Sequence, residues 1–245
     1  MGQIRMDLLI RVFSEALDIV EAGLLGASVY HSKRIGALVA AMGRTLGYDD
    51  DSLSAIATSA MFHDNALTEY ILSEREREDG ESDENMRLHS EYGQRNVEWL
   101  PFKKDISGYV LYHHERADGS GPFGKKKGEY PPEAGLISLA DIVDVAQRLQ
   151  TKRESDLPAI YEYIRGLADI GYDTDDIETL IGVLDADMLK ALKNENLNAT
   201  LNRLIPVWTA DIEDPSVIRI AGMISRIIDY KSKFTTKHTM RVANA

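Results

Sequence analysis

The sequence lacks cysteine altogether. Thiol catalysis, disulfide bonds and cysteine-ligated zinc are therefore excluded, and any metal must be held by nitrogen and oxygen ligands. Long hydrophobic runs are also lacking because charged residues interrupt the apolar stretches, so we expect no membrane-spanning segment. The N-terminal stretch contains no continuous apolar run of the kind that marks a secretory signal, which makes the cytoplasm the expected location.

Basic residues are scarce relative to acidic ones. The chain has 28 lysines and arginines against 40 aspartates and glutamates, for a formal net charge of −12. This balance argues against DNA or RNA as a partner, because a general nucleic-acid-binding surface needs clustered lysine and arginine. A small anionic ligand is still compatible with it, since bound divalent cations and a few basic side chains can reverse the local field.

Strand signals are missing too, because no segment alternates cleanly between apolar and polar residues and hairpin turns are lacking. Apolar residues recur instead at helical spacing, and the 44% hydrophobic content suffices to bury a core. The sequence therefore predicts an all-α fold. Its expected helices cover residues 4–25 and 30–46, a segment from the acidic caps at 49–52 to about 64, the stretches 89–100 and 131–150, three helices within 156–204, and a last one from about 216.

Three regions are predicted along the 245 residues. The metal-binding domain would cover 1–152, a smaller helical accessory region 153–215, and the opening helices of a second, truncated copy 216–245. The last expectation comes from a short internal repeat, since His238-Thr239-Met240-Arg241 resembles His31-Ser32-Lys33-Arg34. The match is short, so chance is an alternative to a tandem protein.

The histidines are concentrated in the first half of the chain. Five of the six precede residue 115, and acidic residues accompany them. We hypothesise that they enclose a pair of metal ions. The candidate ligands are His31, His63, Asp64, His89, His113, His114 and Asp141. Imidazole and carboxylate ligands suit iron, manganese, zinc or nickel better than magnesium. Two such ions about 3.5–4 Å apart would clamp a phosphate and activate water for in-line attack.

Each candidate also has a structural interpretation. The pairs His63-Asp64 and His113-His114 are also what a buried polar pair or an exposed helix end would look like. Asp141 is equally compatible with a hydrogen-bonded carboxylate on a buried helix, and Asp144, one turn later, is expected to be structural.

The candidates stand in an order that resembles the HD-domain phosphohydrolases, specifically the HD-GYP subfamily. The resemblance covers roughly residues 12–150 and rests on five motif elements in the family's order. These are His31-Ser32-Lys33-Arg34, the pair His63-Asp64, His89 followed by Gly93, the run His113-His114-Glu115-Arg116-Ala117-Asp118-Gly119-Ser120-Gly121, and Ala140-Asp141 with Asp144.

The resemblance implies how the ligands divide. His31, His63, Asp64 and Asp141 would hold one metal, and Asp64, as the central catalytic carboxylate, would bridge to a second. That second ion would be completed by His89, His113 and His114. Some relatives add a third metal through a glutamate one turn before the first histidine, where this chain has Ala27. We therefore expect two divalent transition-metal ions, with iron or manganese favoured over zinc or nickel.

The sequence departs from the family pattern at two places. The family usually continues its His-Asp pair as x-Gly-Lys, whereas this chain has Leu67 at the lysine position. The Gly-Tyr-Pro signature is replaced by Gly121-Pro122-Phe123. Arg116 and Lys127, the latter in a lysine run, are candidates to bind substrate phosphate in place of that lysine, although such a run is also typical of a solvated loop.

The leading hypothesis is a metal-dependent phosphohydrolase that acts on a phosphodiester, with cyclic di-GMP as one candidate. Its partner would be a small phosphorylated ligand or a cyclic dinucleotide, and a homodimer is a further expectation. The alternative is a catalytically weak sensor that keeps its metal and binds a nucleotide or a partner protein. The absence of the family's lysine, replaced by Leu67, and of its Gly-Tyr-Pro signature, replaced at Phe123, favours the sensor. The retained metal-ligand candidates favour the enzyme. A scaffold without metal would require the ligand set to be a coincidence.

Overall fold

The structure, a computed structural model, describes residues 2–25, 28–66 and 83–211, together with 215, 218–222 and 225; for residues 19–25 it describes the backbone alone. Helices dominate this part of the chain, which confirms the predicted all-α class. Leu67 and Ala27 lie outside the described residues, as do His238 and most of the predicted second copy. None of the helices in the described ranges is long and apolar enough to cross a membrane.

The centre of the fold is helix α2 (His31–Thr45), whose residues from His31 to Gly43 are all buried. It packs closely against α3 (Asp50–Met61). The N-cap residue of α3 is Asp49, as the acidic run predicted. The Asp49 side chain accepts a hydrogen bond from the Ser52 N–H at 2.8 Å and so caps the new helix. Gly36 permits the close approach, because a Cβ at this position would lie 2.6 Å from Cγ of Met61.

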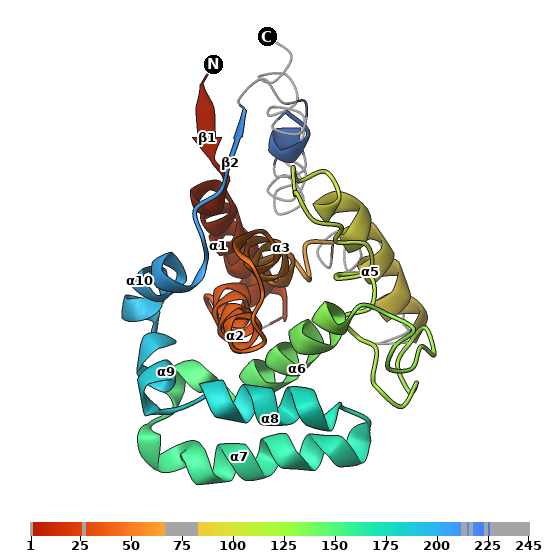
Figure 1. The fold of residues 1–245 in the computed structure, drawn as a ribbon, viewed down its shortest axis with the longest axis vertical. Helices are drawn as coiled ribbons and strands as arrows, with labels where there is room; N and C mark the ends of the chain where they lie inside the picture. The colour runs from red at the N-terminus through yellow and green to blue at the C-terminus, as the bar shows by residue number, and fades with distance from the viewer. Residues whose placement is uncertain are drawn as a thin grey trace.

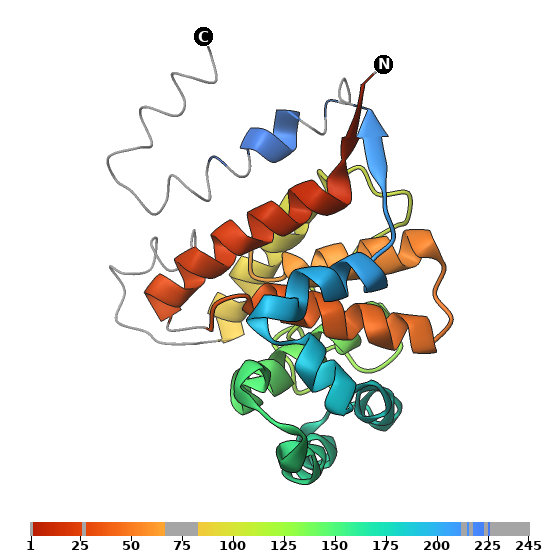
Figure 2. The same cartoon turned by 90° about the vertical axis from the view of Figure 1, so that its left-hand side faces the viewer.

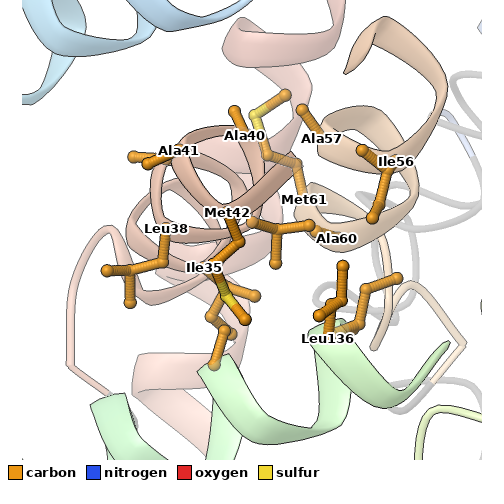
Figure 3. Close-up of a cluster of buried hydrophobic side chains, with 14 of the residues drawn as sticks. Ile35, Leu38, Ala40, Ala41, Met42, Ile56, Ala57, Ala60, Met61 and Leu136 are labelled. Atoms are coloured by element: carbon orange, nitrogen blue, oxygen red, sulfur yellow. The ribbon is translucent and has the colours of Figure 1, made fainter. Parts of the chain in front are cut away.

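Two further helices enclose this pair. Helix α1 (Met6–Leu25) contacts both α2 and α3, and α6 (Pro132–Gln147) contacts α2 from another side. Figure 3 shows the resulting core, in which Leu136 of α6 meets Ile35 of α2 and Ala60 of α3. Helix α5 (Asp83–Val97) lies beside this core in Figure 1. The helices that carry the candidate ligands are therefore held by one shared core.

The chain after α6 adds helices α7 (Leu157–Gly166), α8 (Thr174–Val183), α9 (Ala186–Ala191) and α10 (Asn194–Leu204), with short 3-10 helices at 149–151, 154–156 and 167–170. Helices α7 and α8 contact each other and lie below α6 in Figure 1, whereas α10 returns to pack on α2. The prediction of three helices in 156–204 was wrong. The structure has four α-helices there, because Asp185 caps a new one by accepting the Met188 N–H.

Two other boundaries differ from the prediction. Helix α5 begins at Asp83 rather than at the predicted His89, because acidic residues in its first turn favour a helix start at this position. The expected helix from residue 4 begins at Met6, because residues Gln3–Arg5 form strand β1. This strand pairs antiparallel with β2 (Thr209–Asp211), and both lie at the N-terminal end in Figure 2. Each strand has only three residues, and the two strands are far apart in the sequence. The sequence therefore shows no alternation of apolar and polar residues from which they could be predicted.

Candidate metal centre

All the candidate ligands lie close together in two groups. The first donor group consists of His31, His63 and Asp141, and the second donor group consists of Asp64, His89, His113 and His114. In each group one ligand atom per residue lies within 4.8 Å of the others. The ligands come from the start of α2, the turn after α3, α5, the turns before residue 115, and α6.

The first donor group centres on Asp141 of α6. Its Oδ1 lies 3.1 Å from Nε2 of His31 and 3.8 Å from Nε2 of His63. The rings of His31 and His63 meet edge to face, with centroids 5.8 Å apart. Two imidazole nitrogens and a carboxylate oxygen therefore converge on one point from three separate helices or turns.

The second donor group is equally compact. Nε2 of His114 lies 2.9 Å from Nε2 of His89. Oδ1 of Asp64 lies 3.6 Å from Nε2 of His89 and 3.5 Å from Nε2 of His113. Nδ1 of His89 lies 3.1 Å from the Asn85 carbonyl, so Nε2 of His89 is free to accept a hydrogen bond from Nε2 of His114 or, together with it, to share a cation.

Asp64 connects the two groups. Its Oδ2 lies 3.2 Å from Nε2 of His63, which belongs to the first group, while its Oδ1 faces His89 and His113 of the second. The two oxygens of one carboxylate therefore point to different groups. This is the geometry that a carboxylate bridging two metal ions requires.

The histidines at the centre are oriented for coordination. Nδ1 of His63 faces the Ala60 carbonyl at 3.0 Å, and Nδ1 of His113 faces the Val110 carbonyl, so each Nδ1–H donates to the backbone. The opposite nitrogens, Nε2 of His63 and of His113, are buried and make no hydrogen bond of good geometry in the described part of the chain, although the Asp64 oxygens lie 3.2 and 3.5 Å from them. Buried imidazole nitrogens left unpaired in this way are what an ion would satisfy, so the donor set fits a metal pair.

A buried charged network orients His31. Nδ1 of His31 lies 2.7 Å from Oδ2 of Asp144, and Nε of Arg34 donates to Oδ1 of the same carboxylate at 2.8 Å. Asp144 and Arg34 are essentially inaccessible to solvent. Asp144 was expected to be structural, and its contact with Nδ1 of His31 fits that expectation, because it orients a candidate ligand.

Asp18 of α1 was missed by sequence reasoning. Its Oδ1 accepts the backbone N–H of Ser32 at 2.9 Å and so caps the first turn of α2, directly beside His31. Burial raises the pKa of Asp18. No local pattern could have revealed this cap, because it comes from another helix.

The pKa values of histidines in the two donor groups are shifted in opposite directions. Burial lowers the pKa of His63, but the neighbouring Asp64 and Asp141 outweigh burial and raise that pKa to about 9. Burial likewise opposes the raised pKa of His31, which Asp141 and Asp144 produce. In the second group, burial lowers the pKa of His89 to about 4 and also lowers that of His114. Without metal, His31 and His63 therefore hold protons more strongly than His89 and His114 do.

Arg116 and Lys127 face the accessory region. The Arg116 guanidinium lies over the ring of Tyr172, 5.7 Å from its centroid. Nζ of Lys127 lies 2.6 Å from Oδ2 of Asp173 and 3.2 Å from Oδ2 of Asp175. Both side chains thus contact the start of α8, and their predicted role in binding phosphate stays a prediction.

The loop that replaces the Gly-Tyr-Pro signature is anchored beside the second donor group. Glu115, buried next to His114, accepts the backbone N–H of Phe123 at 2.6 Å and that of Lys125. Arg87, two residues before His89, donates to the Pro122 carbonyl and lies over the Phe123 ring. The altered loop is therefore held by neighbours of two metal-ligand candidates. Glu115 stands in the motif run, but Arg87 had no sequence signal.

The sequence matches the family model of the HD domain over residues 18–163, a span that covers more than half of the chain and contains every candidate ligand. The chain therefore belongs to the HD-domain family, and the predicted family is confirmed. A comparison with curated proteins finds no match.

Among solved structures, the chain is similar to V-cGAP3, a cyclic GMP-AMP specific phosphodiesterase of V. cholerae, with a TM-score of 0.78 and 18% identity over 98% of this chain. The chain spans 64% of the length of that protein. A second similar structure is Bd1817, an HDG"Y"P protein from Bdellovibrio bacteriovorus, at 16% identity and a TM-score of 0.47 over 73% of this chain and 64% of that one. At 18% identity, the first likeness shows a shared fold.

Proposed function

We propose that this chain is a metal-dependent phosphodiesterase that hydrolyses a cyclic dinucleotide with two divalent transition-metal ions. One observation carries the proposal: the predicted ligands fold into two adjoining donor groups that share Asp64. A surface or core coincidence would not be expected to leave Nε2 of both His63 and His113 buried and aimed at the shared carboxylate, unpaired among the residues described.

The proposed reaction is in-line attack of water on phosphorus, which breaks the P–O bond to the leaving sugar oxygen, and that oxygen takes up the proton that balances the one lost by the attacking water. A bound pair of divalent cations would supply Lewis acidity towards the phosphoryl oxygens and a lowered pKa for the attacking water. The protein's own part is to orient the donors. Asp64 offers one oxygen to each group, and the backbone carbonyls of Ala60 and Val110 fix which nitrogen of His63 and His113 faces the centre.

A cyclic dinucleotide is the substrate class that we propose. The similarity to a cyclic GMP-AMP specific phosphodiesterase supports this class, and the motif order supports a phosphodiester more generally. Cyclic di-GMP and cyclic GMP-AMP are therefore the two substrates to test first. Arg116 and Lys127 are proposed to contact the phosphates, and Lys127 would have to leave Asp173 to do so.

The second candidate function is a metal-containing sensor with little or no turnover. The hydrogen bonds of Arg87 to Pro122 and of Phe123 to Glu115 favour it, because the loop that they anchor lies where the family pattern has Gly-Tyr-Pro. A sensor would bind a cyclic dinucleotide without hydrolysing it. Location in the cytoplasm and homodimer formation stay predictions under either function.

Turnover assays separate the two functions. The protein, loaded with manganese or ferrous iron, is incubated with cyclic di-GMP, cyclic GMP-AMP, a linear dinucleotide and a generic phosphodiester. We expect hydrolysis of at least one cyclic dinucleotide, and none by the His63→Ala, Asp64→Ala double variant. Binding of a cyclic dinucleotide with no hydrolysis above that variant would replace the enzyme by the sensor.

Metal analysis tests what both functions share. Protein purified without chelators is expected to contain about two equivalents of a transition metal per chain. A metal content of less than about one equivalent, even after incubation with manganese or ferrous iron, would contradict both proposed functions. The protein would then be interpreted as a scaffold without metal.

A further inference from the structure

The second donor group is assembled from three separate segments of the chain. Asp64 stands in the turn 62–66, His89 in α5, and His113 and His114 at the end of the segment 106–114. Metal ligands must keep their mutual geometry to within about half an ångström, so something must hold these segments in register. Two buried amide side chains meet this requirement.

Asn65 joins the first two segments. Its side chain is 2% exposed, and Nδ2 donates to the Phe62 carbonyl at 2.7 Å and to the Gly93 carbonyl of α5 at 3.0 Å. Nδ2 of Asn96, also on α5, donates to Oδ1 of Asn65 at 2.8 Å. The residue directly after Asp64 is thus bound to the helix that carries His89.

Gln94 joins α5 to the third segment. Its side chain is 5% exposed, and Oε1 accepts the N–H groups of Val110 and Leu111 at 3.0 and 3.1 Å. Nε2 donates to the Ile106 carbonyl at 3.1 Å. One side chain therefore fixes both ends of the stretch that leads directly to His113.

The two connections meet at one place on α5. Gly93 and Gln94 are adjacent, and Gly93 is four residues from His89, so it lies one helical turn away on the same side. A Cβ at Gly93 would lie 3.0 Å from Cγ1 of Val110 and 3.4 Å from the His63 carbonyl oxygen. The three segments therefore come close together one turn from His89, the ligand that α5 would supply.

We propose that Asn65 and Gln94 are positioning residues that hold the second donor group together, so that the metal of this group depends on them more strongly than that of the first group does. The first donor group has a separate support, because His31 is held by Asp144 and Arg34. Nδ1 of His63 is held within its own turn by the Ala60 carbonyl. The inference rests on the proposed metal pair and deepens it.

The test compares metal binding by the wild type and by Gln94→Met and Asn65→Ala, all loaded with manganese. Metal content is measured after buffer exchange, and electron paramagnetic resonance reports whether the manganese ions are coupled as a pair. We expect two equivalents and a coupled signal for the wild type. The variants should keep about one equivalent with an isolated-ion signal, because support of this kind changes metal affinity by roughly 10–100-fold.

Thr200→Val is the matched control. Thr200 is also buried, and its hydroxyl donates to the Ala191 and Asn196 carbonyls, but it lies in α10, away from the centre. This variant should lose thermal stability yet keep two coupled ions. An equal loss of metal from the control would show that general destabilisation is the cause and overturn the proposal.

Asn96→Ala is the milder variant, for use if the others fold poorly. It removes only the hydrogen bond that supports Asn65, and we expect it to weaken the second metal between about two- and tenfold. Wild-type affinity for both ions in Gln94→Met or, if that variant does not fold, in Asn96→Ala would overturn the inference and leave the proposed function intact. A wild type that binds fewer than two ions would instead overturn the proposed function, and the inference with it.

Discussion

The two donor groups share Asp64, yet the protein supports them by different means. The first is held by a buried ionic network in which Arg34 and Asp144 orient His31. The second is held by neutral amides that bind backbone groups, through Asn65 and Gln94. Nearby carboxylates raise the pKa of His31 and His63, whereas burial lowers the pKa of His89 and His114 and leaves these two imidazoles in their metal-binding form. The two donor groups of one centre should therefore differ in how strongly their metal affinity depends on pH.

The largest effect is expected where the two groups meet. Asp64→Asn removes the carboxylate charge that both groups face, so we expect metal content to fall below one equivalent and hydrolysis to fall by about 10³-fold or more. Elemental analysis and the turnover assay measure both. Asp187→Asn, an exposed aspartate on α9, is the matched control and should behave as the wild type. Retention of both ions by Asp64→Asn would show that the groups do not depend on a shared carboxylate.

The ionic support of the first group gives the next prediction. Asp144→Asn leaves the buried Arg34 guanidinium without its counter-charge, and we expect a loss of about 3–5 kcal/mol in the free energy of unfolding, measured by denaturant titration. The surface pair of Lys104 and Asp49 is the control, since it is exposed to solvent and Lys104→Ala should leave the free energy of unfolding almost unchanged. Equal costs for the two variants would contradict the view that burial makes the Arg34–Asp144 pair important.

The difference in protonation predicts a pH dependence. Metal must displace protons from any ligand whose pKa lies above the working pH, and His63, with a pKa of about 9, is such a ligand. Each proton displaced costs about tenfold in affinity per pH unit below its pKa, so the affinity of the first group should fall at least tenfold per unit, with His31 adding to the effect of His63. The pKa of His89, lowered to about 4, and the lowered pKa of His114 should make the second group less sensitive between pH 6 and 8.

Isothermal titration of the metal-free protein in buffers of different ionisation enthalpy measures the protons released with each ion. Gln94→Met, in which the first group is expected to bind alone, identifies which step belongs to which group. Similar proton release from both steps would refute the electrostatic contrast between them.

The smallest effect concerns the loop beside the second group. In Gly121→Ala, the new Cβ would lie 2.6 Å from Cα of Glu115 and 2.8 Å from the His114 carbonyl oxygen, and neither backbone atom can move freely. We expect a loss of about 1–3 kcal/mol in stability, with weaker binding of the second metal. Gly182→Ala on α8 is the control, because its Cβ meets nothing within 4 Å and should be neutral or slightly stabilising. Unchanged stability in Gly121→Ala would mean that the loop is not tightly packed.

Sequence reasoning succeeded where the signal was local. The acidic cap at Asp49, the proline start of α6 and the helical periodicity of α2 were all found in the chain itself. It failed where the partner was remote, as for the strand pair β1 and β2 and for the cap that Asp18 provides to α2. It also gave Asn65 and Gln94 no role, since buried amides resemble any other polar residue until their partners are known.

The sequence by itself determined the chemistry available at the centre. A chain without cysteine, with histidines and aspartates in the order of the HD-domain family, offers imidazole and carboxylate ligands at these positions and no thiolate. Only the tertiary structure decided how these ligands divide and what supports each group, because α1, α2, α5 and α6 are brought together by a core formed from distant residues. Ligand type is a property of each residue, whereas proton affinity and geometry depend on burial and on neighbours that only folding supplies.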